Sequence, residues 1–128
     1  MKRILLTFSI SFLIFPFTGA AQGEQRYASG TATDQENNSF KWINYGTQDW
    51  TIENAKVETY RDGTEIPQVT DASVWANLTT GAWCYYDNDP TKGKLYNWYA
   101  VAGIHDSDPN TPNKEFAPEG WHVPGDAE

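Results

Sequence analysis

The sequence predicts a small α+β domain made of short β-hairpins and two short helices. The chain has 128 residues, enough for one domain of ordinary size. Short alternating segments are separated by Gly, Asn and Asp residues that favour turns, and one later segment repeats apolar residues with helical spacing. Aromatic residues make up 15% of the chain, so an aromatic core is expected rather than a disordered acidic tail.

The N-terminus has the pattern of a secretory signal peptide over residues 1–21. Lys2 and Arg3 precede an apolar run from Ile4 to Phe17, and small residues follow up to Ala21. The run is shorter than the roughly 20 residues that span a bilayer as a helix. No Cys lies near the expected cleavage point after Ala21, which excludes the acylated lipoprotein route. We therefore expect an exported protein that is secreted or held at the cell surface.

Two β-hairpins are expected next. Residues 22–38 are polar and are interpreted as a leader with at most one edge strand. The domain itself is expected to start at residue 39, with a first hairpin that turns near residues 45–48. Asp62-Gly63 predicts a tight turn between two further strands, and Pro67 favours an edge position for the second of them.

Two short helices are expected in the second half, with a strand over residues 82–86 between them. Asp71 can cap the first helix, in which Val74, Trp75 and Leu78 share one face. The second helix is indicated by apolar residues at i, i+3, i+4 and i+7, namely Leu95, Trp98, Tyr99 and Ala102. Both apolar faces predict packing against a core.

Charge excludes one broad class of function. The chain carries 9 Lys and Arg against 17 Asp and Glu, a net charge of −8 at pH 7. Such a surface repels phosphate backbones and anionic lipid headgroups. We therefore expect no nucleic-acid partner and no membrane insertion after signal cleavage.

Aromatic residues in an exported acidic protein suggest a glycan ligand. Trp50, Trp75 and Trp98 lie on alternating or helical apolar patterns and are assigned to the core. In the strand at residues 82–86, Trp83 and Tyr85 point away from Cys84 and Tyr86, so this strand is the expected place for exposed rings. The candidate ligand-binding residues are Trp83, Tyr85, Asp87 and Asn88.

Two acidic loops could in principle bind calcium. Asp87 and Asp89 lie in one loop, and Asp106 and Asp108 in another, and carboxylates are ligands that Ca²⁺ prefers. Neither loop has the spacing of an EF-hand, and such runs commonly form turns. We expect no metal or other cofactor, with calcium as the weaker alternative. No catalytic residues are assigned, so a non-enzymatic role is expected.

Five segments together resemble one known family. They are Trp50–Asn54, Tyr60–Pro67, Leu78–Asn88, Leu95–Val101 and Pro118–Pro124. In this order they are similar to the Fibrobacter succinogenes major paralogous domain, which occurs in exported bacterial proteins, and the likeness runs from about Thr33 to Glu128. Many relatives have a Cys where Phe116-Ala117 stands here, so pairing of Cys84 in a longer relative stays open.

The resemblance carries expectations about fold and completeness. Relatives continue past Glu128, so residues 39–128 are expected to be the N-terminal part of the domain, incomplete at a helix start near Gly125. The closing segment also resembles the formylglycine-generating-enzyme-like domains, which implies a truncated C-type-lectin-like fold.

The expected function is that of an exported, non-catalytic module at the cell surface or in the medium. Such a module would bind a glycan or a cell-surface protein partner. The alternatives are a structural building block of a surface assembly and a nonfunctional gene fragment.

Overall fold

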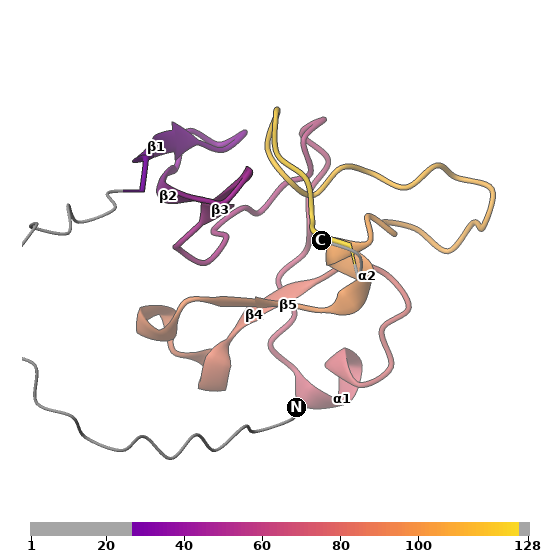
Figure 1. Ribbon diagram of the computed structural model, residues 1–128. Helices are drawn as coiled ribbons and strands as arrows, with labels where there is room; N and C mark the ends of the chain where they lie inside the picture. The colour runs from indigo at the N-terminus through magenta and orange to yellow at the C-terminus, as the bar shows by residue number, and fades with distance from the viewer. Residues whose placement is uncertain (1–26, 126–128) are drawn as a thin grey trace, which may run out of the picture.

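The computed structural model describes residues 27–125. The predicted signal peptide and residues 126–128 of the expected helix start lie outside the described residues. The described part forms two small antiparallel sheets and two one-turn helices (Figure 1). This is the small α+β architecture that the sequence predicts. Between residues 27 and 125, no helix combines the length and apolar character needed to cross a membrane.

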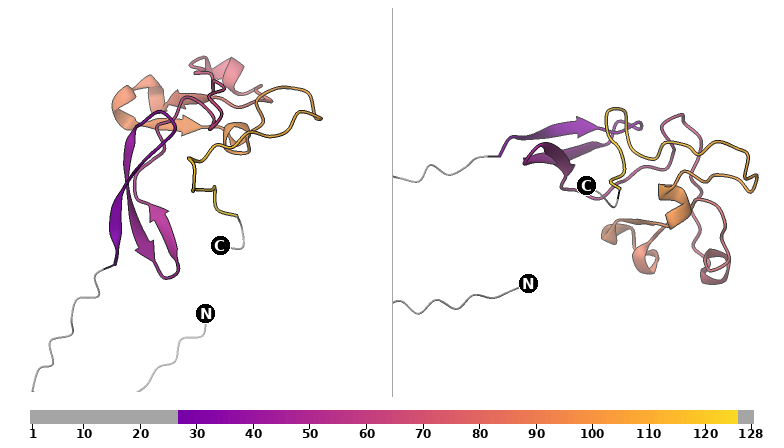
Figure 2. Two further views of the ribbon diagram at one scale, coloured as in Figure 1. Left: turned by 90° about the horizontal axis from the view of Figure 1, so that it is seen from above. Right: turned by 45° about the vertical axis from the view of Figure 1, so that its right-hand side comes forward.

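The first sheet contains β1 (Ser29–Thr33), β2 (Ser39–Tyr45) and β3 (Gln48–Thr51), side by side in that order. The predicted hairpin is confirmed, because Tyr45 pairs with Gln48 and Gly46 supplies the positive φ, 68°, that a two-residue turn needs. Strand β1 is the edge strand expected within the polar leader. Figure 2 shows this sheet projecting to one side of the second sheet.

The second predicted hairpin is reduced to a turn with one β-bridge. Gly63 has φ of 85° in this turn, and Thr59 forms a bridge with Glu65. The Ile66 N–H donates to the Glu58 carbonyl at 2.7 Å across this turn, while the Glu36 carboxylate accepts the backbone N–H groups of Glu58 and Thr59, each at 2.6 Å. A side chain from the β1–β2 connection thus also bonds to this segment.

Helix α1 (Ala72–Trp75) starts where the sequence predicts. The Asp71 carboxylate accepts hydrogen bonds from the backbone N–H groups of Ser73 and Val74 at 2.9 Å. None of the helix residues is buried, and Val74 is 52% exposed. Of the predicted apolar face, Trp75 and Leu78 are half-buried and Val74 is exposed.

The second sheet pairs β4 (Trp83–Tyr85) with β5 (Lys94–Tyr96), and helix α2 (Trp98–Val101) follows. The expectation that the helix includes Leu95 is wrong, because Leu95 lies in β5. Asn97 separates strand from helix. Its side-chain oxygen accepts the N–H groups of Ala100 at 2.9 Å and of Ala82 at 3.1 Å, which caps α2 and ties it to β4.

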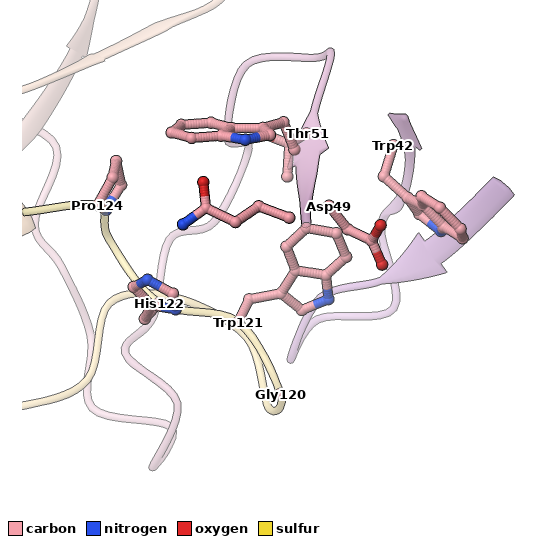
Figure 3. Close-up of a pocket in the computed structure, with 9 residues that line it drawn as sticks. Trp42, Asp49, Thr51, Gly120, Trp121, His122 and Pro124 are labelled. Carbon is pink, nitrogen blue, oxygen red and sulfur yellow. The ribbon is translucent and has the colours of Figure 1, made fainter. Parts of the chain in front are cut away.

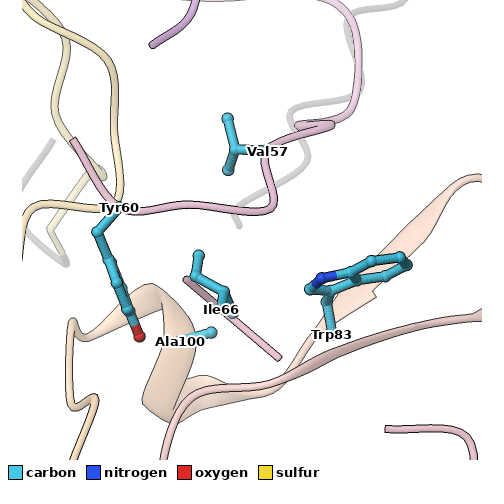
Figure 4. Packing of buried hydrophobic residues seen from close by; sticks show 5 residues of the cluster. All are labelled: Val57, Tyr60, Ile66, Trp83 and Ala100. Carbon is cyan, nitrogen blue, oxygen red and sulfur yellow. The ribbon is translucent and has the colours of Figure 1, made fainter. Parts of the chain in front are cut away.

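The core lies between the segment before α1, strand β4 and helix α2 (Figure 4). It consists of Val57, Tyr60, Ile66, Trp83 and Ala100, against which Tyr85, Tyr96 and Phe116 pack. Burying a side chain such as Val57 or Ile66 stabilises the fold by about 1.5–3 kcal/mol. The tryptophans are placed differently from the prediction, which assigned Trp50 and Trp98 to the core. Trp83 is buried, whereas Trp98 is 69% exposed and Trp50 is 37% exposed.

Candidate functional site: an aromatic cleft

A cleft of about 680 Å³ lies between the first sheet and the C-terminal segment. It is lined by Trp42 of β2, by residues 48–51 of β3 and by Gly120, Trp121, His122 and Pro124. Figure 3 shows the Trp121 indole between the sheet and the C-terminal segment, with the Asp49 carboxylate beside it. Segments about 70 residues apart in sequence therefore build one site.

The position of Trp42 depends on a glycine in the neighbouring strand. Gly30 of β1 pairs with Trp42, and a Cβ atom at Gly30 would lie 2.7 Å from the nearest atom of the indole ring. The ring therefore lies directly against the Gly30 backbone. A residue without a side chain is needed there for Trp42 to form the end of the cleft.

Substitution Gly30→Ala is expected to displace the Trp42 ring without unfolding the protein. The new methyl group meets the end of a side chain, which can rotate away, and not backbone. We expect weaker ligand binding in the cleft and a shifted tryptophan fluorescence spectrum, with a thermal midpoint lowered by only a few degrees. Gly125→Ala, where a Cβ atom meets nothing within 4 Å, is the matched control. Unchanged fluorescence and binding would contradict the role given to Gly30.

Asp49 supplies an oriented carboxylate at the rim. The Asn44 side-chain amide of β2 donates to Asp49 Oδ1 at 2.8 Å and to the Gln48 carbonyl at 3.3 Å. These bonds fix the carboxylate, which stays exposed to solvent. Strand β3 is also the edge of its sheet, and the pairing register turns the backbone groups of Asp49 and Thr51 away from β2. These backbone groups therefore point outward from the edge of the sheet.

Arg61 holds in place the wall of the cleft that the C-terminal segment forms. Its Nε atom donates to the Ala117 carbonyl at 2.9 Å, and Nη2 donates to the carbonyls of Pro118 and Trp121 at 3.0 and 3.1 Å. Gly120, with φ of 79°, lets the chain turn so that Trp121 N–H bonds back to Pro118. Charge-assisted bonds of this kind are stronger than neutral ones. The wall is thus anchored to the core segment through one guanidinium group.

The Trp121 ring also rests on the sheet. Phe40 of β2 meets it edge-to-face, with ring centroids 5.3 Å apart and planes at 80°. Phe40 and Trp42 are on the same face of β2 and are half-buried. The cleft therefore combines three indoles, a fixed carboxylate and an amide. Sugars need this combination, because pyranose C–H faces pack on aromatic rings while hydroxyls bond to carboxylates and amides.

The structure does not gather the four sequence-predicted ligand residues at this cleft. Trp83 is only 4% exposed, and the expectation that it presents an open face is wrong. Lys94 Nζ lies 4.2 Å from the centre of its ring, and the Tyr85 ring packs edge-to-face on it. Tyr85 itself lines a separate polar groove together with Glu58 and Lys94.

Asp87 and Asn88 occupy the turn after β4 and are exposed. Both have positive φ, 55° and 54°, which fits the tolerance of Asx residues for this conformation. Asp87 lies 3.8 Å from Lys92 in an exposed ion pair. These two residues shape the connection to β5, and their ligand role stays a prediction.

The candidate calcium ligands make hydrogen bonds within their own turns. The Thr91 hydroxyl and backbone N–H donate to the Asp89 carboxylate and lower its pKa. The Asn110 backbone and side chain do the same for the pKa of Asp108, and Asp106 accepts from the Asp108 N–H. Over residues 27–125 no three His, Cys, Asp or Glu side chains are grouped as a metal site. Calcium binding at these loops stays a prediction.

The cleft residues were missed for an identifiable reason. The sequence pattern assigns Trp50 to the core because it lies in an alternating strand, but the strand is an edge strand with both faces accessible. Trp121 follows the turn-forming residues Pro118-Glu119-Gly120, which predict that its side chain lies on a loop. No periodicity links residue 121 to residues 42–51, so their proximity could not be read from spacing.

Comparisons with known proteins assign the family. The chain matches the family described as the Fibrobacter succinogenes major domain over residues 43–128. No curated protein matches the chain, and no solved structure does. The matched residues include β3 and the C-terminal segment, and so most of the cleft. The match spans well over half of the sequence, and the chain belongs to the Fibrobacter succinogenes major domain family.

Proposed function

We propose that the protein is an exported, non-catalytic module that binds a glycan in the aromatic cleft. The observation that carries this proposal is that Trp42, Trp50 and Trp121 line one cleft together with the oriented carboxylate of Asp49, Trp50 from the opposite face of β3. Tryptophan faces and fixed oxygen acceptors recognise the two chemical sides of a sugar, its C–H face and its hydroxyl groups. A cleft of about 680 Å³ falls within the range of small-molecule sites.

A binding role is favoured over hydrolysis. Glycoside hydrolysis commonly uses two carboxylates about 5–9.5 Å apart. Among the described residues that line the cleft, Asp49 is the one acidic side chain. The resemblance to lectin-like and formylglycine-generating-enzyme-like domains supports a ligand-binding fold of that kind, and such a fold is part of the proposal.

The test is a binding survey with the purified protein. Soluble oligosaccharides of glucose, xylose, mannose and N-acetylglucosamine are titrated by isothermal calorimetry, with indole fluorescence as a second readout. We expect at least one series to bind with a dissociation constant in the micromolar to millimolar range and to change the tryptophan emission. A folded protein that binds none of the series would overturn the proposal.

Export is tested separately through the predicted cleavage. We expect the N-terminal peptide of the protein recovered outside the cytoplasm to begin at Gln22, because Gly19 and Ala21 provide the small side chains that the peptidase accepts. Mass spectrometry of the recovered protein reads this directly. Leu13→Glu breaks the apolar run and should leave the full chain inside the cell. Recovery of uncleaved protein starting at Met1 would contradict export by this route.

A protein partner is the second candidate, and one observation favours it. Trp98, the first residue of α2, is 69% exposed, and Leu95 of β5 is 45% exposed. Exposed large apolar side chains of this kind mark interaction surfaces. Under this alternative, Trp98→Ala would release the protein from a surface complex while sugar binding stayed unchanged.

A further inference from the structure

The face of the first sheet opposite Trp42 and Phe40 is almost entirely exposed to solvent. Along β1, β2 and β3 every second side chain points to this face, and all of them are exposed except Ile43, which is half-buried. It includes Tyr27, Tyr45 and Trp50, and we call it the tyrosine face. Its strands project from the rest of the molecule, as Figure 2 shows.

The two tyrosines form an ordered aromatic pair. Tyr27 precedes β1 and lies opposite Tyr45, with the Asn44 N–H bonded to the Ala28 carbonyl at 2.6 Å between them. Their rings are stacked with centroids 5.7 Å apart and planes within 16° of parallel. They remain 49% and 68% exposed. The two rings therefore pack on one another while both stay accessible to a ligand.

Charge on this face differs from that of the whole chain. The chain has 17 acidic residues, yet no Asp or Glu points to the tyrosine face among residues 27–33, 39–45 and 48–52. Lys41 is the one ionised side chain there, and Ser29 and Thr31 add hydroxyl groups. A surface of this composition suits an uncharged partner that is rich in hydroxyls.

We propose that the tyrosine face binds the surface of an extended, neutral polysaccharide. The inference deepens the proposed function, and rests on it in taking a glycan as the ligand. Side chains on a sheet face contact a long chain or a packed array of chains, whereas the cleft encloses a few sugar units. Trp50 belongs to the tyrosine face and also lines the cleft, so the two surfaces meet at β3.

Most of this face lies outside the family match. The match begins at residue 43, after Tyr27, β1 and Lys41. Strand β1 is one of the three strands of the sheet, and Tyr27, which precedes it, is one of the two tyrosines of the pair. Attachment to an insoluble polysaccharide is therefore a property that the preceding strand would add to the family domain.

The experiment compares insoluble and soluble glycans. Microcrystalline cellulose, chitin and insoluble xylan are incubated with the purified protein, and the bound fraction is measured by depletion. We expect binding to at least one of them, weakened at least fivefold by Tyr45→Ala and retained by Tyr45→Trp. Tyr86→Ala is the matched control, because Tyr86 is 58% exposed but lies after β4. Circular dichroism melting verifies that each variant is folded.

Soluble oligosaccharides separate this inference from the cleft. We expect Tyr45→Ala to leave their affinity within twofold of the parent protein, and Trp121→Ala to weaken it. Insoluble binding that depends on Tyr45, with no soluble binding at all, would support the tyrosine face and overturn the cleft. Binding to none of the three solids would overturn the tyrosine face alone. So would binding by the Tyr45→Ala and Tyr27→Ala variants that is as strong as that of the parent protein. Tyr45-dependent dimerisation in its place would assign the face to a second copy and also overturn it.

Discussion

Trp121→Ala is expected to weaken glycan binding in the cleft at least tenfold, which corresponds to about 1.4 kcal/mol of binding free energy. The indole forms one wall of the cleft and rests edge-to-face on Phe40. Alanine removes the sugar-stacking face and also the edge-to-face contact between Phe40 and the segment held by Arg61. Isothermal calorimetry with the soluble oligosaccharide that binds the parent protein measures the loss.

Two matched variants control this result. Trp98→Ala removes an indole that is 69% exposed and outside the cleft, and its affinity should stay within twofold of the parent. Trp121→Phe keeps an aromatic face and should bind with intermediate affinity. If Trp98→Ala weakened binding as much as Trp121→Ala, the site would lie at α2 and the cleft assignment would be wrong.

Gly103→Ala is expected to destabilise the protein by about 3 kcal/mol or more. A Cβ atom at Gly103 would collide with the Lys114 carbonyl oxygen and lie 2.7 Å from the Lys114 nitrogen. Both are backbone atoms, and the Lys114 N–H donates to the Gly103 carbonyl at 2.9 Å. Neither the segment around Gly103 nor the segment around Lys114 can move away without breaking that hydrogen bond. The residue also has φ of 78°, which strains any side chain other than hydrogen.

Gly63→Ala separates steric collision from backbone strain. Gly63 has a similar φ of 85°, but a Cβ atom there would meet nothing within 4 Å. We expect a loss of only about 1 kcal/mol for this variant. Urea denaturation followed by circular dichroism measures both. Equal destabilisation by the two substitutions would show that the contact between Gly103 and Lys114 does not hold the C-terminal segment.

Local signals in the sequence account for much of the fold. The turn at Gly46, the helix cap at Asp71 and the turn at Gly63 form as predicted, because each depends on the chemistry of one or two residues. The boundary between β5 and α2 was not predictable in this way. Apolar residues with helical spacing start at Leu95, but Asn97 bonds to Ala82, a partner 15 residues away, and delays the helix.

The candidate site was harder to predict than the fold. Alternation correctly places Trp83 and Tyr85 on one face of a strand, but it does not say which face is buried. That depends on Val57, Tyr60 and Ile66 packing over β4. The cleft likewise depends on a contact between Phe40 and Trp121, 81 residues apart, and on Arg61, which carries no sequence signal of an anchoring role.

The most direct test of the glycan cleft is a titration of the six tryptophan indole N–H signals by NMR, with the soluble oligosaccharide as ligand. Single Trp→Phe variants assign the signals. We expect the signals of Trp42, Trp50 and Trp121 to shift together with one dissociation constant, while those of Trp75, Trp83 and Trp98 stay in place. Shifts confined to Trp75, Trp83 or Trp98 would contradict a binding site between the first sheet and the C-terminal segment.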